Sequence, residues 1–245
     1  FETLRISMRG PVLLEYHMDR LQDSARRLQI PFDRAAMTQE LNAFPGCWRP
    51  GVVKLIYTRG AGGRGYSPSN LDHPTRILSS HPEPAWPAWH YEQGVHLHAC
   101  RTQLSRNPLL AGMKHLNRLE QVLARGEWLD ASACQEGLVC DTDGNMVEGV
   151  MSNLFFVVDE VVQTPSLANC GVAGVLRRWL LEQFQQLRMP VQEVEETPSH
   201  LQCASEVFTC NSVYGVWPVA SLGDLQWAPG AVARRAQALF QQHWL

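Results

Sequence analysis

Apolar and polar residues alternate along this chain in two periodic patterns, one typical of strands and one typical of helices. Residues 51–58 read GVVKLIYT, and this run of branched apolar side chains predicts a buried strand. Four apolar residues from Met18 to Leu28 recur at positions i, i+3, i+7 and i+10, which places them on one face of a helix. Because strands and helices are mixed in both halves of the chain, we expect a fold of the α/β (α+β) class. The expected strands are 1–8, 12–16, 51–58, 75–79, 94–102, 137–140, 154–158, 191–194 and 206–209, and the expected helices are 17–28, 34–44, 115–130, 175–187 and 231–244.

One stretch is too rich in proline for a regular element, and it divides the chain. Residues 81–90, HPEPAWPAWH, hold three prolines and two tryptophans. A chain of 245 residues is long enough for one large or two modest domains. We therefore expect a small N-terminal α/β domain over residues 1–86, a linker over 87–93 and a larger C-terminal domain over 94–245.

Composition narrows the class of protein. Lys and Arg number 21 against 24 Asp and Glu, which gives a net charge of −3 and excludes a strongly basic nucleic-acid-binding protein. The mean hydropathy is −0.20, and no apolar run approaches the roughly 18 residues of a membrane span. The seven cysteines include no C-x-x-C pair, which favours a reducing compartment. We expect a cytoplasmic protein that acts on a small molecule, with neither nucleic acid nor membrane as a partner.

A glycine-rich loop offers one candidate binding site. GAGGRG at residues 60–65 matches the G-x-G-x-x-G pattern, but turn-forming residues follow it instead of the helix that a dinucleotide site requires. We interpret the loop as a lid that carries Arg59 and Arg64 towards an anionic substrate, because the planar guanidinium pairs well with carboxylates. A non-catalytic phosphate- or nucleotide-binding module built on this loop is the alternative from another functional class.

A metal site is weakly indicated. His96, His98 and Cys100 alternate along a predicted strand, so their side chains share one face and resemble a set of zinc ligands. A partly exposed strand face explains the same pattern, and no fourth ligand follows at a suitable spacing. We therefore expect no metal.

Backbone and side-chain donors gather at two other places. Gly171 and Gly174 precede a predicted helix, so the N–H groups of Val175 and Leu176 resemble an anion cradle at a helix start. Asn211 follows a predicted strand and adds donors at its end. Each pattern, taken alone, is also typical of an ordinary turn.

A lysine and a glutamate stand in apolar surroundings. Lys114 lies in LAGMKHLN, where loss of hydration lowers the pKa of an amine and makes it a usable nucleophile or base. A lysine whose stem is covered while its amine reaches water is the alternative. Glu148 lies in VEGVMSNLF, and a carboxylate in such company needs a cationic partner. Together the two residues favour a catalytic site.

These residues resemble the signature of the fold-type IV pyridoxal-phosphate enzymes, the family of branched-chain and D-amino-acid aminotransferases and of aminodeoxychorismate lyases. EGVMSNLF, from Glu148 onward, is similar to the family's stretch around its cofactor-pairing glutamate, and HMDRL at 17–21 is similar to its phosphate-arginine motif. Lys114 lies 34 residues before Glu148, where the family has its Schiff-base lysine. The matches occur in the family's order and span nearly the whole chain.

The resemblance implies a fold, a cofactor and a set of cofactor contacts. The fold would be a two-domain architecture whose larger C-terminal domain is a pseudo-barrel, and the cofactor would be pyridoxal 5'-phosphate. Lys114 would hold the cofactor and move the substrate proton, and Glu148 would keep the pyridine nitrogen protonated. The implied phosphate contacts are Arg20, Val175, Leu176, Ser212 and Val213.

Two stretches are similar to the lyase branch of that family in particular, RGAGGRGY at 59–66 and RNPLLAGMKHLNRLEQ at 106–121. Thr3 matches a threonine that this branch uses in proton transfer. The branch implies conversion of 4-amino-4-deoxychorismate to 4-aminobenzoate and pyruvate, a step towards folate; the alternative is an aminotransferase for branched-chain or D-amino acids. The expected substrate contacts are Arg59, Arg64 and Asn211.

The resemblance also implies a homodimer whose sites are completed from both subunits. Trp86 and Trp89 in the linker are our candidates for the apolar surface between subunits. Members of the family have a further strand and turn before the position of Phe1, so we expect the coding sequence to start earlier than this chain does.

Overall fold

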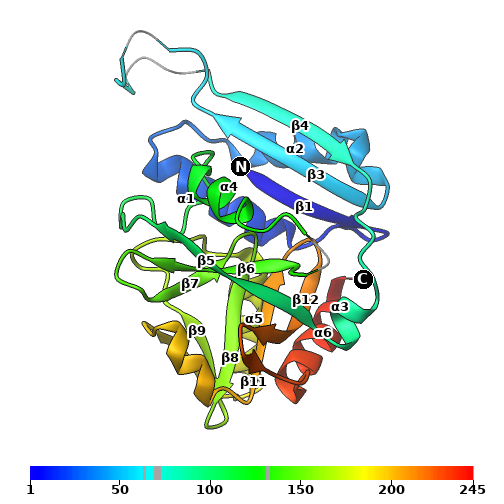
Figure 1. Ribbon diagram of the computed structural model, residues 1–245. Helices are drawn as coiled ribbons and strands as arrows, with labels where there is room; N and C mark the ends of the chain where they lie inside the picture. The colour runs from blue at the N-terminus through cyan, green and yellow to red at the C-terminus, as the bar shows by residue number, and fades with distance from the viewer. Residues whose placement is uncertain (63–64, 69–72, 131–132, 245) are drawn as a thin grey trace. The chain divides into compact units, whose positions relative to one another are not determined.

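The computed structural model describes residues 1–62, 65–68, 73–130 and 133–244, which form two compact units. The first unit contains Phe1–Ala85 together with Lys114–Leu116 and Trp244, and the second contains Trp86–Met113 and Asn117–His243. Figure 1 labels the main helices and strands of both units. Within the described ranges, no helix is both long and apolar enough to cross a membrane.

The first unit is an antiparallel sheet of four described strands in the order β2-β1-β3-β4, with helices α1 and α2 packed on one face (Figure 1). Alternation along β1 produces this arrangement, because Leu4 and Ile6 are buried in the cluster that also contains Met18 of α1 and Met37 of α2. The elements are β1 Glu2–Ser7, β2 Gly10–Pro11, α1 Leu14–Arg27, α2 Arg34–Ala43, the 3-10 helix Pro45–Trp48, β3 Gly51–Thr58 and β4 Thr75–His81.

The second unit is built on a curled sheet of nine described strands, as expected of the pseudo-barrel that the resemblance implies (Figure 1). Its order is β10-β9-β8-β11-β12-β5-β6-β7, and β13 pairs with β12. The strands are β5 Val95–Leu104, β6 Glu136–Asp141, β7 Met146–Gly149, β8 Asn153–Val158, β9 Val161–Pro165, β10 Val191–Val194, β11 Glu206–Asn211, β12 Gly215–Leu222 and β13 Leu225–Gln226. The helices are α3 Trp89–Glu92, α4 Leu119–Arg125, α5 Val175–Gln186, the 3-10 helix Pro198–Cys203 and α6 Ala231–Trp244.

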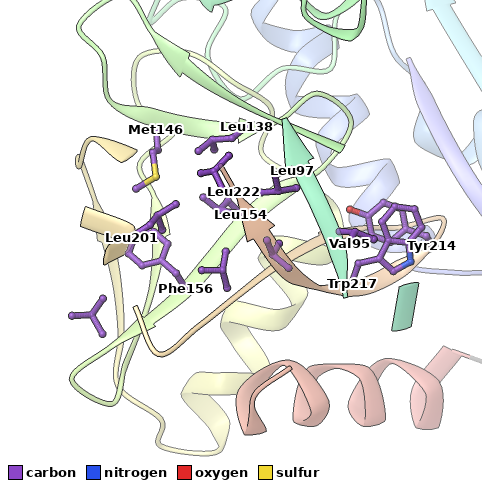
Figure 2. Packing of buried hydrophobic residues seen from close by; sticks show 13 residues of the cluster. Val95, Leu97, Leu138, Met146, Leu154, Phe156, Leu201, Tyr214, Trp217 and Leu222 are labelled. Atoms are coloured by element: carbon purple, nitrogen blue, oxygen red, sulfur yellow. The ribbon is translucent and has the colours of Figure 1, made fainter. Parts of the chain in front are cut away.

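Apolar side chains from several of these strands fill the main core of the second unit (Figure 2). Tyr214 and Trp217 stack face to face there, with ring centres 3.8 Å apart. Trp86 packs edge-on against both rings. Trp86, which we expected to serve as contact surface between subunits, is partly buried against this core.

The predicted elements agree with the structure in most places. Strand 51–58 and helix 231–244 are confirmed with the predicted bounds. The strand predicted over 12–16 is wrong, because Leu13 adopts a left-handed conformation (φ 56°) and α1 begins directly after it. The helix predicted over 115–130 is limited to α4, which Gly126 caps at its C-terminal end. The carboxylate of the next residue, Glu127, is bound to backbone N–H groups of β5.

Candidate active site

A buried carboxylate ties helix α1 to the first strand. Glu2 on β1 accepts a hydrogen bond from Nε of Arg20 at 2.9 Å, and Nη2 of Arg20 also donates to it. Nδ1 of His17 lies 2.6 Å from Oε2 of the same carboxylate. Burial alone raises the pKa of Glu2, but the charge of Arg20 and the hydrogen bond with His17 outweigh it, so this pKa lies well below its usual 4.5. Arg20, the predicted phosphate ligand, is therefore held in place by Glu2.

The other face of β1 carries Thr3, which was predicted to take part in proton transfer. Thr3 pairs with Lys54 across β1 and β3, so both side chains stand on that face. The ring centre of Phe1 lies 4.8 Å from Nζ of Lys114 and 5.3 Å from Nζ of Lys54. The nitrogen of Phe1 also donates to the carbonyl oxygen of Lys114 at 2.7 Å. The first unit thus brings two lysines to a single aromatic ring at the start of β1.

Glu148 is the third residue of strand β7 and is buried. Its Oε2 accepts the N–H of Val172 at 2.8 Å. The residue before Val172 is Gly171, with φ +82°, and a Cβ there would lie 2.6 Å from Cγ1 of Val147. Glycine is therefore required where the segment leading into α5 approaches the carboxylate.

The residues after Glu148 explain the motif physically. A Cβ on Gly149 would lie 2.1 Å from Oγ of Ser152, and Ser152 donates to the buried carboxylate of Glu136 at 2.8 Å. Asn153 donates through Nδ2 to a backbone carbonyl of the segment before α5 at 2.9 Å. A Cβ on Gly174 would lie 1.8 Å from Oδ1 of Asn153. The motif therefore packs the start of β8 tightly against the segment that leads into α5.

The start of α5 offers donors to an anion. Gly174 is the N-cap, and the N–H of Arg178 makes the first bond of the helix, to the carbonyl oxygen of Gly174, at 2.9 Å. Val175 and Leu176 are the first two residues of the helix, so their N–H groups have no partner within it and point along the positive end of the helix dipole. This end of α5 suits the phosphate contacts predicted for it.

The turn between β11 and β12 holds the remaining second-unit candidates. Ser212 is buried. Oδ1 of Asn211 accepts the N–H groups of Val213 and Tyr214, each at 2.9 Å, and Nδ2 of Asn211 donates to the carbonyl oxygen of Met151 at 3.1 Å. The side-chain amide of Asn211 is thus bound to backbone on both sides.

Of the two arginines predicted for substrate binding, the structure describes only Arg59. The guanidinium of Arg59 donates to the carbonyl oxygens of Gln29, at 3.0 Å, and of Leu28, at the C-terminal end of α1. Arg59 would need to leave these carbonyls to meet a substrate. Arg64 lies outside the described residues.

The motifs behind the alternative readings have other surroundings. Nδ1 of His96 lies 2.7 Å from Oγ of Ser221, and Nε2 of His98 lies 3.3 Å from a carboxylate oxygen of Glu127. No cluster of three or more His, Cys, Asp or Glu side chains suited to a metal ion is found in the described part of the chain. After the glycine-rich loop, the next described element is strand β4 and not the helix that a dinucleotide site requires.

Sequence reasoning missed three residues of this region. Lys54 interrupts the apolar run GVVKLIYT, and a charge inside a predicted buried strand was the available signal. Glu2 alternates in phase with Leu4 and Ile6, so its burial was predictable from the strand pattern alone. Glu136 gave no signal in the sequence, because its role depends on a loop that lies 14 to 16 residues further along.

Comparisons with known proteins bear on the fold and the family of this chain. A family model described as amino-transferase class IV matches residues 1–222. An aminodeoxychorismate lyase from Vibrio harveyi is 40% identical over 90% of this chain and 83% of its own length. A branched-chain-amino-acid aminotransferase from Escherichia coli (strain K12) is 27% identical over 98% of this chain and 82% of its own length. The solved 4-amino-4-deoxychorismate lyase from Pseudomonas aeruginosa is 49% identical with a TM-score of 0.95, covering 99% of this chain and 89% of that one.

Proposed function

This chain belongs to the class IV aminotransferase family, and from that premise we propose that it is a pyridoxal-phosphate-dependent lyase. Its reaction converts 4-amino-4-deoxychorismate into 4-aminobenzoate and pyruvate, which serves the synthesis of folate. The observation that carries this proposal is the higher identity to two relatives named as lyases, 40% for that from Vibrio harveyi and 49% for that from Pseudomonas aeruginosa, than to the aminotransferase from Escherichia coli, 27%.

The cofactor of the family is pyridoxal 5'-phosphate, and the residues present suit it. Its phosphate dianion calls for cationic and N–H donors, which Arg20 and the start of α5 supply. Its ring nitrogen calls for a buried carboxylate, which Glu148 supplies. When bound, the cofactor withdraws electrons from the substrate carbon that bears the amine, and this makes the proton on that carbon acidic.

The residues around the cofactor would have three different roles. We assign Lys114 to holding the cofactor and to removing the substrate proton through its Nζ. Glu148 keeps the ring nitrogen protonated, and the N–H of Val172 holds the carboxylate in place for that task. The phosphate ligands we propose are Arg20, Val175, Leu176, Ser212 and Val213.

The substrate contacts follow from charge. The substrate carries two carboxylates, so cationic side chains should meet it. Lys54 stands beside Thr3 and near the same ring as Lys114, and we add it to Arg59 and Arg64 as a substrate contact. The hydroxyl of Thr3 delivers a proton to the departing enolpyruvyl group. Asn211, which we expected to contact the substrate, has its side-chain amide bound to backbone groups on both sides.

An aminotransferase for branched-chain or D-amino acids is the second candidate, because relatives with that name cover nearly the whole chain. An aminotransferase binds two substrates in turn and keeps the aminated cofactor between them. A lyase needs one substrate and regenerates the aldehyde cofactor in each cycle. A lysine at the proposed substrate face suits a dicarboxylate better than the apolar side chain of leucine or valine.

We propose that the enzyme works as a homodimer. Helix α4 exposes three apolar side chains, Leu119, Val122 and Leu123, to between 64 and 72% of their surface. Such a patch on a short helix is typical of a surface that a second subunit covers. This patch replaces the linker tryptophans as our candidate contact.

We further propose a cytoplasmic location. All seven cysteines are unpaired thiols, as expected in a reducing compartment. Small-molecule substrates, with neither nucleic acid nor membrane as a partner, fit the net charge of −3.

The test of the proposed function is a direct assay. The purified chain, loaded with pyridoxal phosphate, should release pyruvate and 4-aminobenzoate in equal amounts from 4-amino-4-deoxychorismate. Lys114→Ala should lose the visible absorbance of the bound cofactor, and borohydride should no longer fix the cofactor to the 110–117 peptide. Efficient amino transfer from leucine or D-alanine to a 2-oxo acid, without 4-aminobenzoate, would support the aminotransferase instead.

A further inference from the structure

A short loop connects the proposed cofactor-pairing residue with the next strand. Strand β7 ends at Gly149, one residue after Glu148, and β8 begins at Asn153. The residues between them, Val150–Ser152, are called the pairing loop here. Because β7 is only four residues long, the position of Glu148 depends on how this loop is held.

Glu136 holds the pairing loop from one side. Its carboxylate accepts the N–H of Val150 at 3.0 Å, the N–H of Met151 at 3.3 Å and the hydroxyl of Ser152 at 2.8 Å. Glu136 has no exposed surface, and burial raises its pKa although these bonds act in the opposite direction. A buried carboxylate that serves three consecutive residues leaves the loop little freedom.

Asn211 holds the same loop from the other side. Strand β11 pairs with β8 up to Cys210 opposite Asn153, so Asn211 comes next to the pairing loop. Its Nδ2 donates to the carbonyl oxygen of Met151 at 3.1 Å. Met151 is therefore bound through its N–H to Glu136 and through its carbonyl to Asn211. This one residue links the two side chains and serves as a joint between them.

Asn211 also shapes the turn proposed to bind phosphate. Its Oδ1 accepts the N–H groups of Val213 and Tyr214 at 2.9 Å each, and this fixes the turn that contains Ser212. Tyr214 is anchored in turn, since its hydroxyl donates to Oγ1 of Thr209 at 3.0 Å and its ring stacks on a core tryptophan. One side chain thus joins the pairing loop to the phosphate turn.

We propose that Glu136 and Asn211 are positioning residues which fix the spacing between Glu148 and the Ser212 turn, so that the ring nitrogen and the phosphate of one cofactor are recognised together. This inference rests on the proposed cofactor site. It assigns Asn211 to holding the site together and removes it from the surface that meets the substrate.

The first test uses Asn211→Ala and two readouts on the cofactor itself. Apo-protein titrated with pyridoxal phosphate should bind it about tenfold more weakly, because the variant loses the three hydrogen bonds that hold Met151 and the Ser212 turn. The absorption maximum of the bound cofactor, which is sensitive to the charges around its ring, should also shift, although the hydrogen bonds of Asn211 go to Met151, Val213 and Tyr214. KM for the substrate should change less than cofactor affinity does.

A matched control separates positioning from general stability. Asp141 caps the β6–β7 turn as Asn211 caps its own, since its Oδ1 accepts the N–H groups of Asp143 at 3.0 Å and Asn145 at 2.9 Å. Asp141→Ala removes the same kind of cap at the end of β7 away from Glu148. It should lower the melting temperature while leaving the absorption maximum of the cofactor at the wild-type position.

A second variant covers the case in which Asn211→Ala does not fold. Asn211→Asp keeps the acceptor for the turn and replaces the donor to Met151 with a carboxylate oxygen that repels its carbonyl, so it should fold and still shift the absorption maximum. Glu136→Gln should act on the same joint, and its effect on cofactor affinity should be non-additive with that of the Asn211 variant.

The outcomes are separable. Additive effects of the two changes, or a wild-type absorption maximum in both Asn211 variants, would overturn this inference while the proposed function stands. Failure of the wild-type chain to bind pyridoxal phosphate would overturn both. Loss of affinity and a shifted maximum in the Asn211 variants, with an unshifted Asp141 control, would support the positioning role.

Discussion

The carboxylate of Glu2 accepts a 2.9 Å hydrogen bond from Nε of Arg20, and this contact joins the first strand to the proposed phosphate ligand. Both side chains are largely covered, with 1% of the Glu2 and 11% of the Arg20 side chain exposed. A charge pair shielded from water in this way fixes the direction of the guanidinium as well as its charge. The phosphate site therefore depends on a residue that would not touch phosphate.

The first prediction is that Glu2→Gln weakens cofactor binding. A neutral amide loses the ionic part of two hydrogen bonds to Arg20, so the dissociation constant for pyridoxal phosphate should rise about 10- to 100-fold. Titration of the apo-protein measures it. Glu83→Gln is the control, because Glu83 pairs with Arg5 while 40% of its side chain is exposed, and exposed pairs contribute little. Equal cofactor affinity in Glu2→Gln and wild type would contradict the role given to Glu2.

The second prediction concerns pH and His17. Burial lowers the pKa of His17 below its ordinary value of 6.5, so the unfolded chain binds the proton more readily than the folded one. The resulting stability is complete above pH 6.5 and is lost as the pH falls below it. Urea unfolding from pH 5 to 8 should show this loss in the wild type and a flatter profile in His17→Gln.

Glu2 acts in a different pH range, which allows the two groups to be told apart. Its pKa is lowered from 4.5, so its contribution to stability is present above pH 4.5 and lost only at lower pH. A flat wild-type profile between pH 5 and 6.5 would count against a buried neutral His17.

Much of the fold followed from local patterns. Leu4 and Ile6 alternate with polar residues in β1, and α1 carries its apolar face at helical spacing, so their packing was predictable. Local patterns did not predict the curl of the second sheet, because parallel pairs such as β12 with β5 join residues more than a hundred positions apart; only the family resemblance implied a pseudo-barrel. Sequence alone gave no basis for choosing such partners.

The sequence likewise indicated some residues of the candidate site and not others. Lys114 and Glu148 stood out in the sequence because burying a charged side chain among apolar residues costs free energy, which suggests a functional reason for its presence. The side chains that hold the site were harder to foresee, since the roles of Glu136 and Asn211 depend on a backbone carbonyl and N–H groups in other loops. Backbone groups leave no trace in the identity of the residues that carry them.

The third prediction is that Lys54 recognises a substrate carboxylate. Lys54→Met keeps most of the side-chain volume and removes the charge, so kcat/KM should fall about 30-fold. This corresponds to a loss of roughly 2 kcal/mol of transition-state stabilisation. The absorption spectrum of the bound cofactor should stay as in the wild type. Lys54→Arg should recover part of the loss, because it restores a cation on the face shared with Thr3. A normal kcat/KM in Lys54→Met would remove Lys54 from the substrate contacts.

The fourth prediction tests the apolar patch on α4. Leu123 is 64% exposed, so Leu123→Glu should fold normally while placing a charge in the proposed dimer contact. Sedimentation should show a dissociation constant at least tenfold higher than in the wild type, equivalent to about 1.4 kcal/mol. Leu187 is 40% exposed and lies outside the patch, so Leu187→Glu is the matched control. A wild-type chain that is monomeric and fully active at micromolar concentration would refute the dimer.

The last prediction concerns Glu148 and separates charge from shape. Glu148→Gln preserves an acceptor for the N–H of Val172, now 2.8 Å from Oε2, but removes the negative charge that keeps the ring nitrogen protonated. The barrier should rise by about 3 kcal/mol, so kcat should fall on the order of 10²-fold. Cofactor affinity should change much less, because the proposed phosphate contacts are untouched. Glu148→Asp restores the charge on a shorter side chain and should regain part of the rate. Steady-state kinetics on fully loaded enzyme measure these values, and wild-type turnover in Glu148→Gln would show that the ring nitrogen has another partner.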